Sequence, residues 1–91
     1  MKKLDANVRS LKLKAKKIRK QGFATGMLKR NTGEFIPVYL RGNEVDKFLK
    51  QYGDKSEVEL HIGDLKLNTK IVEVHRNILN HNAINVDFHE I

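Results

Sequence analysis

The sequence predicts a mostly β domain, a small barrel or half-barrel of five or six short strands with short helical segments. Several short segments alternate apolar and polar residues with the period of two that a half-buried strand requires. Only one segment clearly carries apolar residues at helical spacing. The 91 residues suffice for one domain, residues 1–91, with one modest core. Together these features favour a barrel over a doubly wound α/β fold.

The first third of the chain combines strands with a basic segment. Residues 4–9 alternate apolar and polar side chains, which predicts a half-buried strand with Arg9 on its polar face. Residues 12–21 are typical of a basic turn or short helix, and Gly22 is suited to end it. Residues 23–29 predict a second strand, although an internal glycine weakens the pattern. The apolar residues of the first strand are Leu4, Ala6 and Val8.

A turn and a third strand follow. Asn-Thr-Gly at residues 31–33 is a turn signal. The next strand, residues 35–41, contains Pro37, which has no N–H to donate to a ladder. The strand is therefore predicted at a sheet edge or beside a bulge. Its inward residues are Ile36, Val38 and Leu40, and its outward residues are Phe35, Pro37 and Tyr39.

One helix has a predicted start and end. Asn43 is a favourable N-cap, and Asp46 stands three residues on, at the acidic position of a capping box. Apolar side chains recur at helical spacing over residues 45–52. Gly53 is suited to end this helix.

The second half predicts a hairpin and a final strand. Residues 57–62 and 65–71 both alternate, and a Gly-Asp turn joins them. The alternation then changes phase, which indicates a bulge near residues 70–72 or a strand buried on both faces toward its end. A polar loop at residues 75–82 precedes the last strand. In that strand the inward residues are Ile84, Val86 and Phe88, and the outward residues are Asn85, Asp87 and His89.

The charge is unevenly placed along the chain. Residues 1–30 hold eleven Lys and Arg and one acid, whereas residues 31–91 carry a net charge of −3 within a total of +7. A basic surface beside a near-neutral body is the pattern expected of a phosphate-binding protein. A solubilising basic tail is the alternative. A membrane-binding helix is excluded because residues 14–20 contain only two apolar side chains.

Catalytic and metal-binding motifs are not found in the sequence. There is no cysteine, neither serine lies in a Gly-x-Ser-x-Gly turn, and no glycine-rich phosphate loop is present. The four histidines lack the His-x-x-x-His spacing of a helical zinc site and are interpreted as surface residues. We therefore expect neither an enzyme nor a cofactor. No apolar run reaches the roughly 20 residues of a membrane span, and no signal peptide is seen, so we expect a cytoplasmic protein.

Polar residues on the outer sheet face are candidates for reading RNA. Asn85 and Asp87 are expected to project outward from the last strand, and Arg9 from the first. Amide and carboxylate groups bind base edges and ribose hydroxyls, while Arg and Lys bind phosphates. A carboxylate is useful there only as an acceptor from a base amino group. A solvated polar face is the alternative interpretation.

Four blocks span almost the whole chain in order: residues 8–9 with the basic run 16–22, residues 35–40 with the helix after them, residues 71–76, and residues 85–88. Together they resemble the bacterial large-subunit ribosomal proteins that bind 5S rRNA, the Ctc general-stress family (ribosomal protein twenty-five), in its short single-domain form. Residues 8–9 with the basic run 16–22 resemble the arginine-rich block of the family. Residues 35–40 and the helix after them are similar to its Ile-Pro strand and helix. Residues 71–76 resemble its Val-Gln-Arg-His-Pro run, and residues 85–88 resemble its terminal His-Val-Asp-Phe.

The resemblance implies a six-stranded antiparallel or mixed β-barrel that grips an irregular internal loop of 5S rRNA within the large ribosomal subunit. It implies no cofactor, although Mg²⁺ held by the RNA can lie at the interface, and a monomer off the ribosome. The residues expected to contact RNA are Arg9, Lys16, Lys17, Arg19, Lys20, Lys29, Arg30, His75, Arg76, Asn85 and Asp87.

The chain departs from the family pattern at several positions. Residues 25–30 replace the usual Pro-Ala-Val-Val-Tyr-Gly, so Lys29 and Arg30 stand where tyrosine and glycine are usual. His75 replaces glutamine, and Asn85 replaces histidine. Two alternatives therefore stay open: a divergent paralogue that binds another structured RNA, and an interaction module that binds an acidic protein partner.

Overall fold

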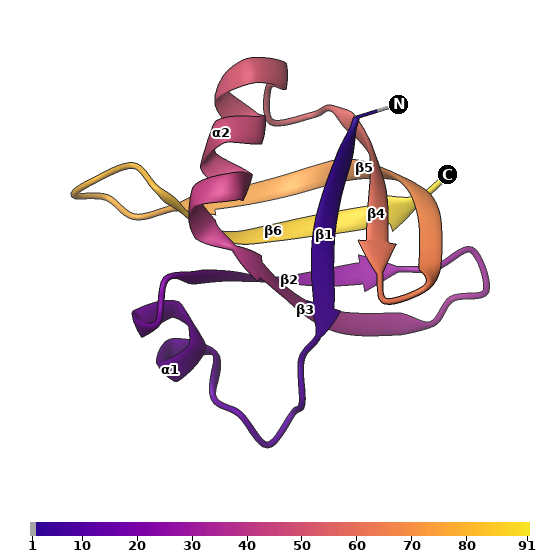
Figure 1. Cartoon of the computed structure of the whole chain (residues 1–91), viewed down its shortest axis with the longest axis horizontal. Helices are drawn as coiled ribbons and strands as arrows, with labels where there is room; N and C mark the ends of the chain where they lie inside the picture. Colours follow the sequence, from indigo (N-terminus) through magenta and orange to yellow (C-terminus); the bar gives the residue numbers. More distant parts are fainter. Residues whose placement is uncertain (1) are drawn as a thin grey trace.

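The computed structural model describes residues 2–91 and forms a closed β-barrel with two short helices (Figure 1). The elements are β1 (Lys3–Val8), α1 (Ala15–Lys20), β2 (Phe23–Lys29), β3 (Phe35–Arg41), α2 (Gly42–Tyr52), β4 (Glu57–Ile62), β5 (Leu65–Arg76) and β6 (Ala83–Glu90). The order around the barrel is β1-β3-β2-β6-β5-β4. Two pairs, β1 with β4 and β2 with β6, are parallel, and the others are antiparallel. The predicted mixed six-stranded barrel is confirmed.

The barrel interior is filled by the apolar residues that alternate along the strands. The largest fully buried side chain is Phe88, and α2 adds Val45, Phe48 and Leu49 to the same core. Burying such side chains is the main stabilising contribution in a domain of this size. Val8 was expected to join them but is 58% exposed, because β1 leaves the barrel at this residue.

Pro37 was predicted at a sheet edge or beside a bulge, but it lies in an internal strand whose pairings show no register shift, so this prediction is wrong. β3 is paired with β2 on one side and with β1 on the other. The Pro37 carbonyl accepts a hydrogen bond from the Arg9 N–H at 2.8 Å, immediately after β1 ends at Val8. Its nitrogen faces the same side, where the β1–β3 ladder stops. The missing N–H is tolerated at this end of the ladder.

Two other local predictions are corrected. α2 begins at Gly42, so Asn43 lies inside the helix, and Arg41 occupies the N-cap position without a side-chain cap. The reason is that β3 runs directly into α2, and the Gly42 N–H donates to the Gly22 carbonyl at 2.9 Å. The loop predicted at residues 75–82 is shorter than expected, because β5 continues through Arg76 in antiparallel pairing with β6.

Two irregularities shape the β5–β6 pair. The register shifts between Ile71 and Glu73, which leaves Val72 as an extra residue and confirms the predicted bulge. A second shift, between His75 and Arg76, leaves Ile84 extra on β6. Ile84 is therefore half-buried rather than fully inward, and Ala83 is buried instead.

β2 and β6 approach each other most closely at Gly26. A Cβ atom at this residue would lie 1.9 Å from the Val86 carbonyl oxygen. The parallel ladder pairs Thr25 with Asn85 and Leu28 with Phe88, but residues 26 and 27 have no ladder partner on β6. The glycine that weakened the strand prediction is thus what allows the two strands to close the barrel.

Candidate nucleic-acid interface

A chain of polar contacts crosses the outer face where β2 meets β6. We call Thr25, Met27, Asn85 and Asp87 the β2–β6 seam. Thr25 Oγ1 donates to Asn85 Oδ1 at 3.1 Å, and Asn85 Nδ2 donates to Asp87 Oδ1 at 3.0 Å. The Met27 N–H donates to the same Asp87 oxygen at 3.0 Å. Asp87 therefore satisfies a backbone donor at the interruption of the β2–β6 ladder.

Arg19 joins α1 to this seam. Its Nε and Nη2 atoms donate to Thr25 Oγ1 at 3.1 and 2.8 Å, and Nε also approaches the Ile84 carbonyl at 3.2 Å. Thr25 is only 2% exposed although it points outward, because α1 covers it. Two of the three guanidinium nitrogens of Arg19 are thus used within the protein.

The lysines of α1 are arranged differently. Lys16, Lys17 and Lys20 are exposed and form no ion pair with any carboxylate in residues 2–91. Ile18 is the buried residue that holds this one-and-a-half-turn helix against the barrel. The first turn contains no acidic residue, and the last turn contains three basic ones. α1 therefore presents uncompensated positive charge beside the seam.

Arg9 lies half-buried just beyond β1. Its Nη1 atom donates to the Leu13 carbonyl at 3.3 Å, which shapes the loop that leads to α1. Its Nε atom is buried and has no hydrogen-bond partner among residues 2–91. Leaving a buried donor without a partner costs free energy, and none of the described residues satisfies this one.

Lys29 and Arg30 lie at the opposite end of the outer face, beside the β2–β3 turn. Lys29 is exposed, and its Nζ atom lies 5.7 Å from the centroid of the Phe35 ring. Arg30 Nε lies 3.3 Å from Glu90 Oε1, and the Asn31 N–H donates to the same oxygen at 3.0 Å. The Asn31 N–H, and then the Arg30 guanidinium, hold the pKa of Glu90 below its usual range.

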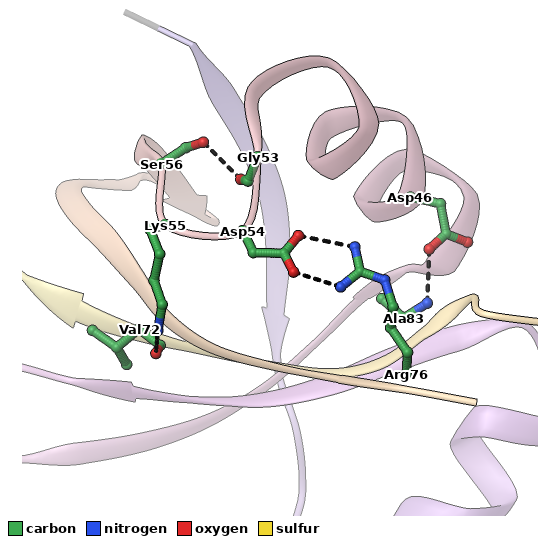
Figure 2. Close-up of polar contacts among 8 residues, drawn as sticks. All are labelled: Asp46, Gly53, Asp54, Lys55, Ser56, Val72, Arg76 and Ala83. Atoms are coloured by element: carbon green, nitrogen blue, oxygen red, sulfur yellow. Dashed lines mark hydrogen bonds and ion pairs between the residues drawn. The ribbon is translucent and has the colours of Figure 1, made fainter. Parts of the chain in front are cut away.

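His75 and Arg76 end β5 and both have acidic partners. His75 lies opposite Asn85 in the β5–β6 register, and its Nε2 atom lies 2.8 Å from Glu73 Oε1. Arg76 donates two hydrogen bonds to Asp54, at 2.6 and 2.9 Å, which tie the end of β5 to the α2–β4 turn (Figure 2). The hydrogen bond from Arg76 lowers the pKa of Asp54, and that of Arg76 is raised in return.

Figure 2 also shows why Asp46 does not act in a capping box. Its Oδ1 atom accepts a hydrogen bond from the Ala83 N–H at 2.8 Å, which joins α2 to the start of β6. On the other side of the Asp54–Arg76 pair, Lys55 donates to the Val72 carbonyl, the group freed by the β5 bulge. The Asp46–Ala83 and Arg76–Asp54 contacts fix the end of the barrel next to the β5–β6 loop.

A cavity of about 450 Å³ lies between α1, the start of α2 and the β5–β6 loop. It is lined on one side by Lys16, Arg19 and Lys20, and on the other by asparagines of the loop. The sequence predicted the cations but missed the asparagines. The Asn-rich composition of residues 77–82 was the available signal.

The four histidines are not grouped into a metal centre in the part of the chain that the structure describes. Within residues 2–91, no three His, Cys, Asp or Glu side chains are placed to hold a metal ion together. His61 instead bonds to Glu59, and this hydrogen bond lowers the pKa of the Glu59 carboxyl. None of the helices in residues 2–91 has the length and apolar composition to cross a membrane.

Comparison with known protein families shows which family the chain belongs to. The Ribosomal L25p family matches residues 4–88, which is nearly the whole chain and includes four strands in full and most of β1 and β6. The chain belongs to the Ribosomal L25p family. A comparison with curated proteins gave no match. The resemblance found in the sequence is confirmed, and the family is one of structural ribosomal proteins rather than enzymes.

Proposed function

We propose that this protein is a structural constituent of the large ribosomal subunit and binds an internal loop of 5S rRNA. The single observation that carries the proposal is the position of α1. This helix carries the unpaired lysines and is bonded through Arg19 to Thr25 of the β2–β6 seam, on the outer face of an L25-type barrel. Phosphate binding and base recognition thus meet on one surface.

The candidate contacts divide by chemistry. Lysines 16, 17 and 20 are suited to phosphates because no carboxylate of residues 2–91 pairs with them. Asn85 and Asp87 are suited to base edges in an irregular, widened minor groove, and the seam holds them in fixed orientation. The full proposed set is Arg9, Lys16, Lys17, Arg19, Lys20, Lys29, Arg30, His75, Arg76, Asn85 and Asp87.

Arg30 and Arg76 can bind RNA only while their guanidinium groups also remain paired with carboxylates of the protein. Each already pairs with a carboxylate, Glu90 and Asp54 respectively, so their net charge toward RNA is reduced. They serve the interface by rigidifying the β2–β3 turn and the end of β5. A monomeric, cytoplasmic protein that needs no cofactor of its own is consistent with this role.

The test is competition between a 5S internal-loop fragment and a regular RNA duplex of equal length at near-physiological salt. Equal charge cancels most of the counterion contribution, so a preference reports groove shape and base contacts. We expect a preference of at least about tenfold, or about 1.4 kcal/mol, for the loop. Equal binding of both RNAs would contradict the assignment and favour a paralogue with another structured RNA target.

An acidic protein partner is the second candidate, favoured by the same exposed lysines of α1. Pull-down from native cells before and after ribonuclease treatment separates the two, since only a protein partner survives the nuclease. Ribosome fractionation adds the decisive control. A stoichiometric ribosomal protein must sediment with the large subunit.

A further inference from the structure

The cavity between α1 and the β5–β6 loop has the charge of an anion site. Lys16, Arg19 and Lys20 recur at the i, i+3 and i+4 spacing that places side chains on one face of a helix, and all three line it. Lys17 belongs to the same helix but does not line the cavity. No acidic residue lines it. A phosphate entering the cavity therefore meets cations without a competing carboxylate.

The opposite wall of the cavity is preformed. Asn77 Oδ1 accepts a hydrogen bond from the Leu79 N–H at 2.8 Å, and Asn80 Oδ1 accepts one from the Asn82 N–H at 3.0 Å. The His81 N–H donates to the Asn77 carbonyl at 2.9 Å, and His81 adopts a φ of 62°. These local bonds fix the loop, so little ordering is needed when a ligand binds.

Two further lining residues have amides without a structural task. Asn43 does not cap α2, and neither its side chain nor that of Asn82 makes a hydrogen bond within residues 2–91. Each amide offers both donors and an acceptor. This combination suits a nucleobase edge, whereas a bare phosphate has no use for the acceptor.

We propose that this cavity binds one unstacked nucleotide of the RNA. Its phosphate lies against Lys16 and Lys20, and its base edge lies against the amides of Asn43 and Asn82. The volume, about 450 Å³, is within the range of small-ligand sites. The inference rests on the proposed function, because it assigns a second binding site to the same RNA, on the side of α1 away from Lys17.

The first experiment tests the cavity without 5S rRNA. Adenosine monophosphate and inorganic phosphate are titrated separately into the ¹⁵N-labelled protein, and the side-chain amide signals of Asn43 and Asn82 are followed by NMR. We expect saturable shifts of both signals with the nucleotide and much smaller ones with phosphate, which can bind Lys16 and Lys20 but offers no base edge to the amides. Equal shifts with phosphate would reduce the cavity to an anion site, and no shifts with either would overturn the proposal.

The second experiment uses the 5S internal-loop fragment. The N43A/N82A double variant is expected to bind it about tenfold more weakly with an unchanged salt slope, because base contacts but no phosphate contacts are removed. The matched control is Asn68→Ala, an exposed asparagine of β5 outside the cavity, which should stay within about twofold. Unchanged binding by the double variant would overturn the proposal.

Abasic substitutions identify the nucleotide. When the base that occupies the cavity is removed, the double variant and the wild type should bind the RNA equally. A constant tenfold difference at every unpaired position would show that the amides do not contact an unstacked base. If the wild type does not prefer the loop fragment over a duplex, the 5S proposal fails, and the mononucleotide titration still decides the cavity.

Discussion

The seam and α1 lie next to each other, but the polar side chains of the seam are hydrogen-bonded to one another, whereas the lysines of α1 are unpaired within the described residues. In the β2–β6 seam, Thr25, Asn85 and Asp87 are joined in one hydrogen-bonded chain that ends on the Met27 backbone. On α1, three lysines have no carboxylate partner in residues 2–91. The first arrangement fixes geometry at the cost of freedom, and the second keeps charge available. Recognition of a shaped RNA needs both.

Arg19 marks the boundary between the two regions. It stands among the lysines in sequence, but its guanidinium is bonded to Thr25 and approaches the Ile84 carbonyl. The planar guanidinium can satisfy several acceptors at once, which an ammonium cannot do with the same geometry. Neighbouring cations of one short helix therefore divide into one that anchors the helix and others that face solvent.

Gly26→Ala should break the seam with the largest effect. Its Cβ would lie 1.9 Å from the Val86 carbonyl oxygen, so β2 and β6 must move apart. We expect a loss of about 3 kcal/mol or more of unfolding free energy, measured by urea denaturation. Gly63→Asn is the control, since nothing lies within 4 Å of Gly63 and asparagine tolerates its φ of 58°. Equal stability of both variants would refute the close approach of the strands.

Asp87→Ala tests whether the hydrogen-bonded chain of the seam stabilises the fold. The change removes the acceptor of the Met27 N–H and should cost about 1–3 kcal/mol in the absence of RNA. Asp87→Asn retains an oxygen acceptor and should recover most of the stability. If both variants unfold at the wild-type temperature, Asp87 has no structural task and only recognition of RNA remains for it.

The strands could be predicted because their alternation is local, and the bulge at Val72 because it breaks that alternation. The seam could not, since Asp87 and Met27 are brought together only by barrel closure. The outward position of Asp87 was read from the sequence, but its hydrogen bond to β2 was not. Asn43 failed as an N-cap for a related reason: β3 continues into α2 without the turn that an N-cap implies.

The partners of the predicted cations were also beyond the sequence. Asp54 and Arg76 are 22 residues apart, and Arg30 and Glu90 are 60 apart. No local spacing relates them, so a count of basic residues overstates the charge that these two arginines offer to RNA. The lysines of α1 were predicted more faithfully, because their isolation from acids is visible in the sequence itself.

Lys17→Ala and Lys20→Ala test the role of the unpaired lysines of α1. Each change should leave thermal unfolding nearly unchanged, because neither lysine forms an ion pair within residues 2–91. If the lysine contacts a phosphate, the slope of log affinity against log salt should fall by roughly 0.7 to 0.9 for each variant. Fluorescence titrations of the 5S loop fragment at several salt concentrations measure this slope. Unchanged slopes would remove α1 from the interface.

Glu90→Gln gives the smallest effect and separates charge from hydrogen bonding at the β2–β3 turn, which belongs to neither the seam nor α1. The Asn31 N–H and Arg30 lower the pKa of Glu90, so its value is lower in the folded than in the unfolded state. The stability that the carboxylate contributes is therefore present above its unfolded pKa of ~4.3 and is lost as the pH falls through the folded value.

The Glu90→Gln variant keeps a side-chain oxygen that accepts hydrogen bonds but removes the charge. We expect the variant to melt slightly below the wild type at neutral pH, with the gap in Tm closing on acidification. Glu34→Gln, an exposed change with no side-chain hydrogen bond in residues 2–91, should show no such closure. A difference in Tm that stays constant with pH would mean that the negative charge of Glu90 contributes nothing to stability through Arg30 and Asn31.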